Sequence, residues 1–156
     1  MGIIAPKKGN AASQVLITLL VIIFSPILIA AVFIYLLWGA ILYATIWLTQ
    51  GKQFVVFVYS DSPIWENYIE TEILPHTQDR AVILNWSDRR NWKNSLPVLA
   101  FRYFGGYRNF NPIGMVFRPF RFVKTYRFFE AFKAFKHGNR SKVEDLKKAL
   151  FDEIGV

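Results

Sequence analysis

The chain of 156 residues contains no cysteine. Disulfide bonds, thiol catalysis and metal sites built on cysteine are therefore excluded. It has only two histidines, His76 and His137, and neither stands at a recognisable metal-ligand spacing from carboxylates. No nucleophile-elbow motif surrounds any serine, so the sequence gives no support to a Ser-His-Asp triad. We accordingly expect no catalytic constellation, no metal and no other cofactor.

Charge is absent over a long stretch near the N-terminus, because no charged residue occurs between Lys8 and Lys52. Residues 14–50 are almost all aliphatic or aromatic. A helix needs about 20 apolar residues to cross a bilayer core of about 30 Å, and a straight helix over 14–50 would measure about 55 Å. The stretch also exceeds the roughly 7–15 apolar residues of a signal peptide. We predict a polar tail at 1–13 followed by a transmembrane segment at 14–50.

Two arrangements accommodate a segment that is longer than the bilayer core is thick. In the first, one tilted span covers about 16–38 or 27–48 and the rest lies in the interface or continues towards the soluble domain. In the second, Ser25-Pro26 breaks the helix and gives a re-entrant insertion with both ends on one side. A single span is the preferred interpretation. Aromatic residues that suit a lipid–water boundary stand in the C-terminal half of the segment, at Trp38, Tyr43 and Trp47.

Orientation rests on the lysines at the two ends of the segment. Lys7 and Lys8 precede it, whereas Lys52 alone follows it and acidic residues come next. Positive charge is favoured on the cytoplasmic side. The single-span interpretation therefore places the N-terminus in the cytoplasm.

Residues 52–156 are long enough for one compact domain. Apolar and β-branched runs predict buried strands, and amphipathic spacing with capping residues predicts helices. Asp61 or Ser62 is expected to cap the first of these helices and Pro75 to end it, and Ser141 is expected to cap the last. The predicted strands are 53–59, 80–86, 113–117 and 122–130; the predicted helices are 63–74 and 142–154, with a mixed region at 88–104 interrupted by Pro97.

This β-α-β-α-β-β-α order resembles the thioredoxin fold in three places. Residues 53–59 lead into Asp61-Ser62-Pro63-Ile64 at a helix start, where a thioredoxin has Cys-Gly-Pro-Cys. AVILNWS at 81–87 matches the second central strand, and NPIGMVF at 111–117 looks like the segment in which a cis-proline precedes the third strand. The resemblance implies an α/β domain of three layers with a mixed sheet of about four strands. Both redox cysteines are replaced, by Asp61 and Ile64, so disulfide exchange cannot operate.

The same resemblance places four residues near one another, namely Asp61, Ser62, Pro63 and Pro112. A functional interpretation is a groove that pairs with an extended peptide beside Pro112 and receives an anionic group at the helix start. The alternative is that Asp61 and Ser62 only cap a helix and Pro112 only shapes a turn. The sequence favours this alternative.

Residues 101–140 contain nine Arg or Lys, thirteen Phe or Tyr and one acid, Glu130, whereas 53–79 contains five acids and no Lys or Arg. Beside a membrane, such a basic face fits anionic lipid, with about 1 kcal/mol for each well-placed cation, or a protein partner. Nucleic acid is the weakest of the three partners, and the alternative to all three is that core aromatics alternate with solvated charges. The cations expected to face lipid or partner are Arg118, Arg121, Lys124, Arg127, Lys133, Lys136 and Arg140.

The sequence therefore predicts a single-pass membrane protein whose α/β domain binds a partner protein or anionic lipid and has no catalytic role. The rival interpretation is an enzyme of glutathione-transferase type, which needs no cysteine. Ser60 or Ser62 would then supply the active hydroxyl, and Pro112 would help to hold the ligand backbone.

Overall fold

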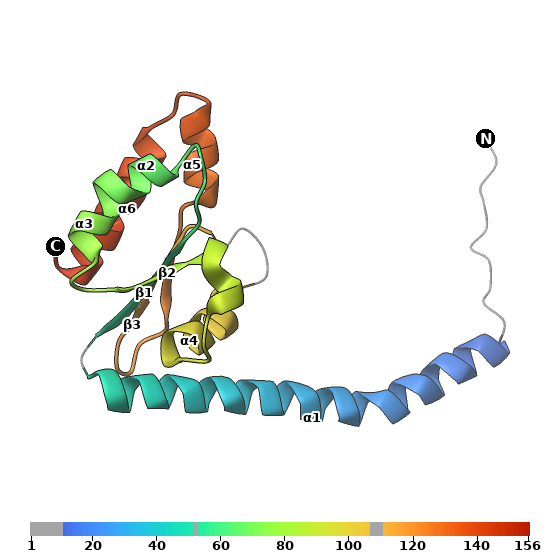
Figure 1. Ribbon diagram of the computed structural model, residues 1–156. Coiled ribbons are helices and arrows are strands. Elements are labelled where there is room, and N and C mark those ends of the chain that lie inside the picture. The colour runs from blue at the N-terminus through green and yellow to red at the C-terminus, as the bar shows by residue number, and fades with distance from the viewer. Residues whose placement is uncertain (1–10, 52, 107–110) are drawn as a thin grey trace, which may run out of the picture. The chain divides into compact units, whose positions relative to one another are not determined.

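The computed structural model of the chain describes residues 11–51, 53–106 and 111–156 (Figure 1). Most of the tail predicted at 1–13, and part of the turn predicted between Gly105 and Pro112, lie outside the described residues. The chain divides into two compact units, Met1–Ala40 and Ile41–Val156. The first consists, where described, of most of one long helix, and the second contains the sheet.

The long helix α1 runs from Ala11 to Gln50. It contains Pro26 and is assigned as one helix through that residue. From Val15 to Leu37 the large apolar side chains of α1 are exposed. Within the described residues, α1 is the one helix long and apolar enough to cross a membrane, over Ser13–Gln50.

The sheet of the second unit has four strands in the order β2-β1-β3-β4. Strands β1 and β2 are parallel, with Val56 opposite Val82, while β3 is antiparallel to both β1 and β4. The small mixed sheet predicted from the sequence is thus confirmed. The strand bounds are β1 Phe54–Tyr59, β2 Val82–Asn85, β3 Ile113–Phe117 and β4 Lys124–Arg127.

Three short helical pieces follow one another after β1: α2 (Glu66–Tyr68), a π-helix η1 (Ile69–Ile73) and α3 (Leu74–Thr77). The prediction that Pro75 ends this helix was wrong. Pro75 stands in the first turn of α3, where a missing N–H is tolerated. The predicted cap was also wrong, because α2 starts after Trp65 without a side-chain cap.

The mixed region after β2 resolves into a 3₁₀ helix, η2 (Trp86–Asn91), and α4 (Leu96–Phe104), with Pro97 in the first turn of α4. The segment predicted as one strand at 122–130 is shared between two elements. Strand β4 covers only Lys124–Arg127, and the residues from Phe129 onward belong to helix α5 (Phe129–Lys136). The last helix, α6 (Ser141–Ile154), was predicted correctly, but Ser141 provides no side-chain cap to it.

Alternating residues of the strands form two separate cores, one on each face of the sheet. Val55, Phe57 and Val116 face helices α2, η1, α5 and α6. These helices gather on one side of the sheet in Figure 1, and α4 lies on the other. Gly114 permits close packing on the first side, because a Cβ there would lie 3.1 Å from a methyl group of Leu150.

The second core includes the end of α1. Val56, Val58 and Met115 cluster with residues of α4 and with Leu42 and Ile46, which are almost fully buried. The compact unit consequently begins at Ile41, whereas the sequence analysis placed the domain boundary at residue 52. The final turns of the apolar helix contribute to the core of the domain.

Candidate functional site

A pocket of about 170 Å³ opens where β1 ends and β3 begins. Its lining brings together Ser60, Ser62 and Pro112, which lie about fifty residues apart in the sequence. Aromatic side chains form the rest of its wall: Trp65 stacks on Phe132 with ring centroids 4.8 Å apart. The Asn111–Pro112 peptide bond at its edge is cis.

Two of the four residues proposed for this groove do not line it. The carboxylate of Asp61 accepts a hydrogen bond of 2.6 Å from the Asn85 side-chain amide. Its backbone N–H donates to the Ser87 hydroxyl at 3.1 Å. Asp61 therefore joins the end of β1 to the segment after β2. Pro63 is exposed and is also absent from the pocket lining.

Asn111 also lines the pocket and was missed in the sequence analysis. Its side-chain oxygen is buried and has no hydrogen-bond partner among the described residues. A buried polar atom without a partner is costly. The pocket thus offers an unused acceptor beside two serine hydroxyls and an aromatic wall, a combination suited to a small polar or peptide-like ligand.

The predicted basic face is divided by internal ion pairs. Glu153 of α6 binds Arg118, at 2.7 Å between Nη1 and Oε1, and also binds Lys124. The Tyr126 hydroxyl donates to the same carboxylate at 3.2 Å. Burial, and then the charge of Glu153, raises the pKa of Tyr126 to about 12. The hydrogen bond from Lys124 lowers the pKa of Glu153.

Arg140 belongs to a second network of ion pairs and hydrogen bonds, which lies among the helices. Its Nε lies 2.9 Å from a carboxylate oxygen of Glu144, and Lys147 lies 2.8 Å from the other oxygen. Tyr68 donates a hydrogen bond to Glu144 at 3.0 Å. Hydrogen bonds from Lys147, Arg140 and Tyr68 lower the pKa of Glu144 to about 2, against the effect of its burial.

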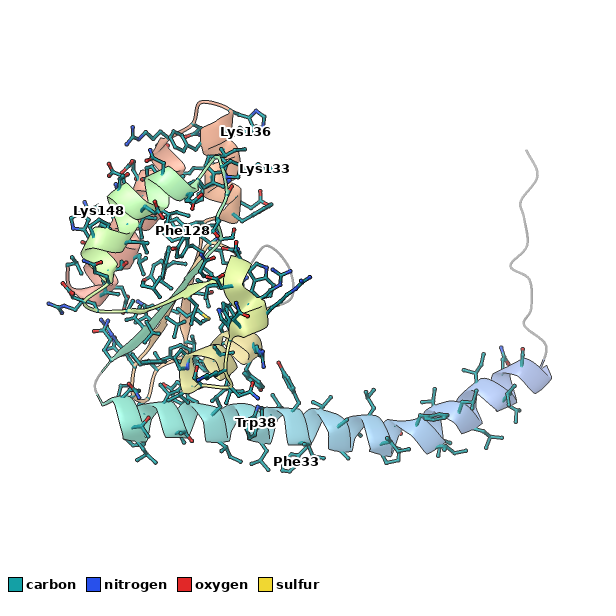
Figure 2. The ribbon with its side chains drawn as sticks, in the orientation of Figure 1. Phe33, Trp38, Phe128, Lys133, Lys136 and Lys148 are labelled. Atoms are coloured by element: carbon teal, nitrogen blue, oxygen red, sulfur yellow. The ribbon has the colours of Figure 1, made fainter. Side chains whose placement is uncertain are left out.

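Four of the seven predicted cations form no ion pair within the described part of the chain: Arg121, Arg127, Lys133 and Lys136. Lys133 and Lys136 are exposed on α5 (Figure 2). Arg121 lies in the loop between β3 and β4, and Arg127 ends β4. The seven cations thus come from four segments of the chain: the loop between β3 and β4, strand β4, helix α5 and the start of α6.

The loop between β3 and β4 has a structure that the sequence analysis did not foresee. Residues 118–121 form a turn in which the Arg121 N–H donates to the Arg118 carbonyl at 3.3 Å. Phe120, the third residue of the turn, has φ of +58°. A type II turn has a positive φ there and normally carries Gly or Asn, so a phenylalanine is strained. Its ring is 84% exposed, and that of Phe122 is 98% exposed.

The end of α1 fixes this loop. The Tyr43 hydroxyl lies within hydrogen-bonding distance of the Arg118 and Arg121 carbonyls and accepts from the Arg121 N–H at 3.3 Å. The rings of Trp47 and Phe120 meet edge to face, with centroids 4.5 Å apart. We name the loop Arg118–Val123 with Tyr43 and Trp47 the aromatic–basic loop. The sequence signal was the run Arg-Pro-Phe-Arg-Phe at 118–122, of which only Phe122 lay within the strand predicted at 122–130.

The described residues contain no cluster of His, Cys, Asp or Glu able to hold a metal ion. Comparison of the chain with protein-family models, with curated proteins and with solved structures finds no match. The functional proposals below therefore depend on the geometry of the chain itself.

Proposed function

We propose that this protein is a single-pass membrane protein whose domain at Ile41–Val156 is a non-catalytic binding or scaffold module at the membrane surface. The module contacts anionic lipid or recruits a protein partner. The observation that carries the proposal is helix α1, which is apolar, uncharged and exposed over more residues than a bilayer requires. Exposure of so many large apolar side chains to water would be strongly unfavourable.

The packing of α1 favours one of the two predicted spans. Leu42 and Ile46 are buried against the sheet. A span at 27–48 would draw the folded domain into the hydrocarbon, together with its charged residues. A span near 16–38 keeps them outside. We propose this span, with the N-terminus in the cytoplasm because Lys7 and Lys8 precede it.

Alkaline extraction of membranes that contain the full-length protein tests the anchor. The protein is expected to remain in the membrane pellet. Leu28→Arg should make insertion less favourable by about 3–4 kcal/mol, as measured in a translocon insertion assay. Leu48→Arg is the matched control and should leave insertion unchanged, because residue 48 lies beyond the proposed span. Release of the unsubstituted protein by alkali would contradict the proposal.

The domain is proposed to have a thioredoxin-like fold without redox chemistry. Two features support this: the order of its elements, and the position of Ser60, Ser62 and Pro112 around one pocket. The pocket has no thiol, because the chain has no cysteine. We propose a binding role for this groove.

Affinity capture with the detergent-solubilised full-length protein tests the binding role. Ser62→Trp fills the pocket and is expected to abolish capture of a groove-bound partner. Lys148→Trp, on the exposed side of α6, is the matched control and should leave capture unchanged. Capture that is insensitive to Ser62→Trp would exclude the groove as the binding site.

The pocket also supports one enzymatic function. Two serine hydroxyls beside Pro112 fit the glutathione-transferase alternative, in which Ser60 or Ser62 supplies the active hydroxyl. Titration with glutathione should then change the fluorescence of Trp65 in the pocket wall, and Ser62→Ala should abolish the change. A titration without a saturable response would remove this alternative.

A further inference from the structure

We propose that a surface formed by η2, α4 and the segment between them binds an acidic segment of a protein partner. The inference rests on the proposed binding role of the domain and adds a second site to the pocket at Ser62. We call this site the η2–α4 surface. Its residues are Trp86, Arg89, Arg90, Trp92, Lys93 and Arg102.

Three aromatic rings fix this surface to the core of the domain. The rings of Trp86, Trp92 and Phe101 meet edge to face, with centroids 5.6 to 5.8 Å apart. Phe101 is only 4% exposed and belongs to the core shared with β1 and β3. Trp86 and Trp92 pack against that core and remain partly exposed. The rings therefore join η2 and α4 into one surface.

Two arginines are held on this aromatic base by contacts that leave their charge uncompensated. The Arg89 guanidinium lies 5.0 Å from the centroid of the Trp86 ring, and its Nη1 donates to the Trp86 carbonyl at 3.2 Å. The Arg102 Nη1 donates to the side-chain oxygen of Asn94 at 3.0 Å. An arginine positioned in this way is prepared for a carboxylate, which it can bind through two parallel hydrogen bonds.

The charge of the surface is not balanced by acids. Between Asn85 and Tyr103 the chain has four Arg or Lys and one acid, Asp88. All four cations are exposed, and none forms an ion pair with any residue that the structure describes. An acidic ligand would supply here the carboxylates that Glu144 and Glu153 supply to the cations around α6.

The composition of the surface favours a protein over other acidic partners. Trp and Arg are enriched at the energetic centres of protein interfaces. Single-stranded nucleic acid needs free aromatic faces for its bases, whereas Arg89 already lies over Trp86. A lipid interface needs exposed apolar side chains, but every exposed residue from Ser87 to Ser95 is polar or charged. A second copy of the chain is disfavoured by its net charge of +8.

Fluorescence anisotropy with the full-length protein in detergent tests the inference. The probe is a fluorescein-labelled hexaglutamate peptide, and hexaglutamine is the uncharged reference peptide. The test variant is the double substitution Arg89→Gln, Arg102→Gln. The matched control is Lys133→Gln, Lys136→Gln, which removes the same charge from exposed positions of α5 (Figure 2). Near-UV circular dichroism checks that each variant remains folded.

We expect saturable binding of hexaglutamate and none of hexaglutamine. The substitutions at Arg89 and Arg102 should weaken binding about tenfold, because two groups that hydrogen-bond to carboxylates are removed. The control double variant should weaken it by less than about twofold, through net charge alone. Ser62→Trp should leave hexaglutamate binding unchanged, because other residues line the pocket.

Equal weakening in the two double variants would overturn the inference, since net charge alone would then explain the binding. Absence of saturable binding would also overturn it. If the capture that depends on Ser62 still occurs, only the η2–α4 surface fails. If that capture is absent too, the proposed protein-binding role fails with it.

The other occupants are separate outcomes of the same titration. Oligothymidylate or soluble dihexanoyl phosphatidylglycerol that displaces the probe at a lower concentration than unlabelled hexaglutamate would assign the surface to nucleic acid or to anionic lipid. Self-association of the protein that the substitutions at Arg89 and Arg102 abolish would assign it to a second copy of the chain. Each of these results would overturn the assignment to an acidic protein segment.

Discussion

The two faces of the sheet are closed by different means. One face is covered by α2, η1, α5 and α6, and α6 provides the ion-paired carboxylates of Glu144 and Glu153. The other face is covered by α4 and by the last turns of α1, a helix without a charged residue. We call these the helical face and the anchor face. The helical face is completed by the domain itself, whereas the anchor face requires residues of the long apolar helix α1.

This difference changes the meaning of the domain boundary. The apolar sequence ends at Lys52, where the composition changes. The core of the domain, however, begins earlier in the chain, at Leu42. The same residues that make α1 apolar enough for lipid also make it suitable to cover a sheet. Hydrophobicity alone does not distinguish these two environments.

The largest effect is expected on the helical face, from Phe132→Ala. Phe132 is fully buried and lies against Trp65 and Tyr68, with centroids 4.8 and 5.5 Å away. Removal of a buried phenylalanine ring should lower the free energy of unfolding by about 3–5 kcal/mol. Urea unfolding of the full-length protein in detergent measures it. Phe129→Ala, at an exposed position of α5, should cost much less, and equal losses would refute the assigned burial.

The second effect tests the anchor face. Ile46→Ala removes a side chain that is only 2% exposed and should lower the free energy of unfolding by about 2–4 kcal/mol. Leu48→Ala, two residues later on α1 and 77% exposed, should change it by less than about 0.5 kcal/mol. The same urea measurement applies. Similar values for the two variants would mean that α1 does not belong to the core of the domain.

A smaller effect is expected where α1 holds the aromatic–basic loop. Tyr43→Phe removes the hydroxyl that bonds to Arg118 and Arg121, and should cost about 1 kcal/mol. Hydrogen exchange at the Arg121 amide should also become faster. Tyr59→Phe is the control, because no described hydrogen bond involves the Tyr59 hydroxyl. Unchanged exchange at Arg121 would show that Tyr43 does not hold the loop.

The smallest effect concerns pH and the helical face alone. The pKa of Glu144 is lowered to about 2 in the folded protein, so its contribution to stability is present above about pH 5. This contribution decreases as the pH falls towards 2, because the unfolded chain then binds the proton first. Glu144→Gln should flatten the stability profile between pH 5 and 2, as measured by thermal unfolding. A stability profile as steep as that of the parent protein would exclude Glu144 as the cause. Glu70→Gln on η1 is the control and should leave the slope of the profile unchanged.

Local sequence signals were sufficient for the first three strands and the last helix. The run IGMVF became β3 with the predicted bounds, and the amphipathic spacing at 142–154 became α6. They were insufficient where tertiary contacts decide the outcome. Packing on Trp65 and the sheet placed Phe128, Phe132 and Phe135 outside strand β4. Pro75 was accommodated because a π-helix precedes it.

The candidate site was predicted in part. The positions of Ser62 and Pro112 around one pocket followed from the order of the elements, but the hydrogen bond from Asn85 that turns Asp61 aside involves a strand 24 residues away. Composition located the cations but not their partners. The pairing of Arg118 and Lys124 with Glu153 depends on where α6 ends relative to β4, which no local pattern encodes.

The burial of Leu42 and Ile46 has a consequence for how the protein is turned over. A protease that cleaved at Lys52 would remove Leu42 and Ile46 from the cluster that contains Val56, Val58 and Met115, and would leave α4 alone on that face of the sheet. Such a fragment would be prone to unfold or aggregate. Release of the domain with its core complete would therefore require a cut before Ile41, where the compact unit begins.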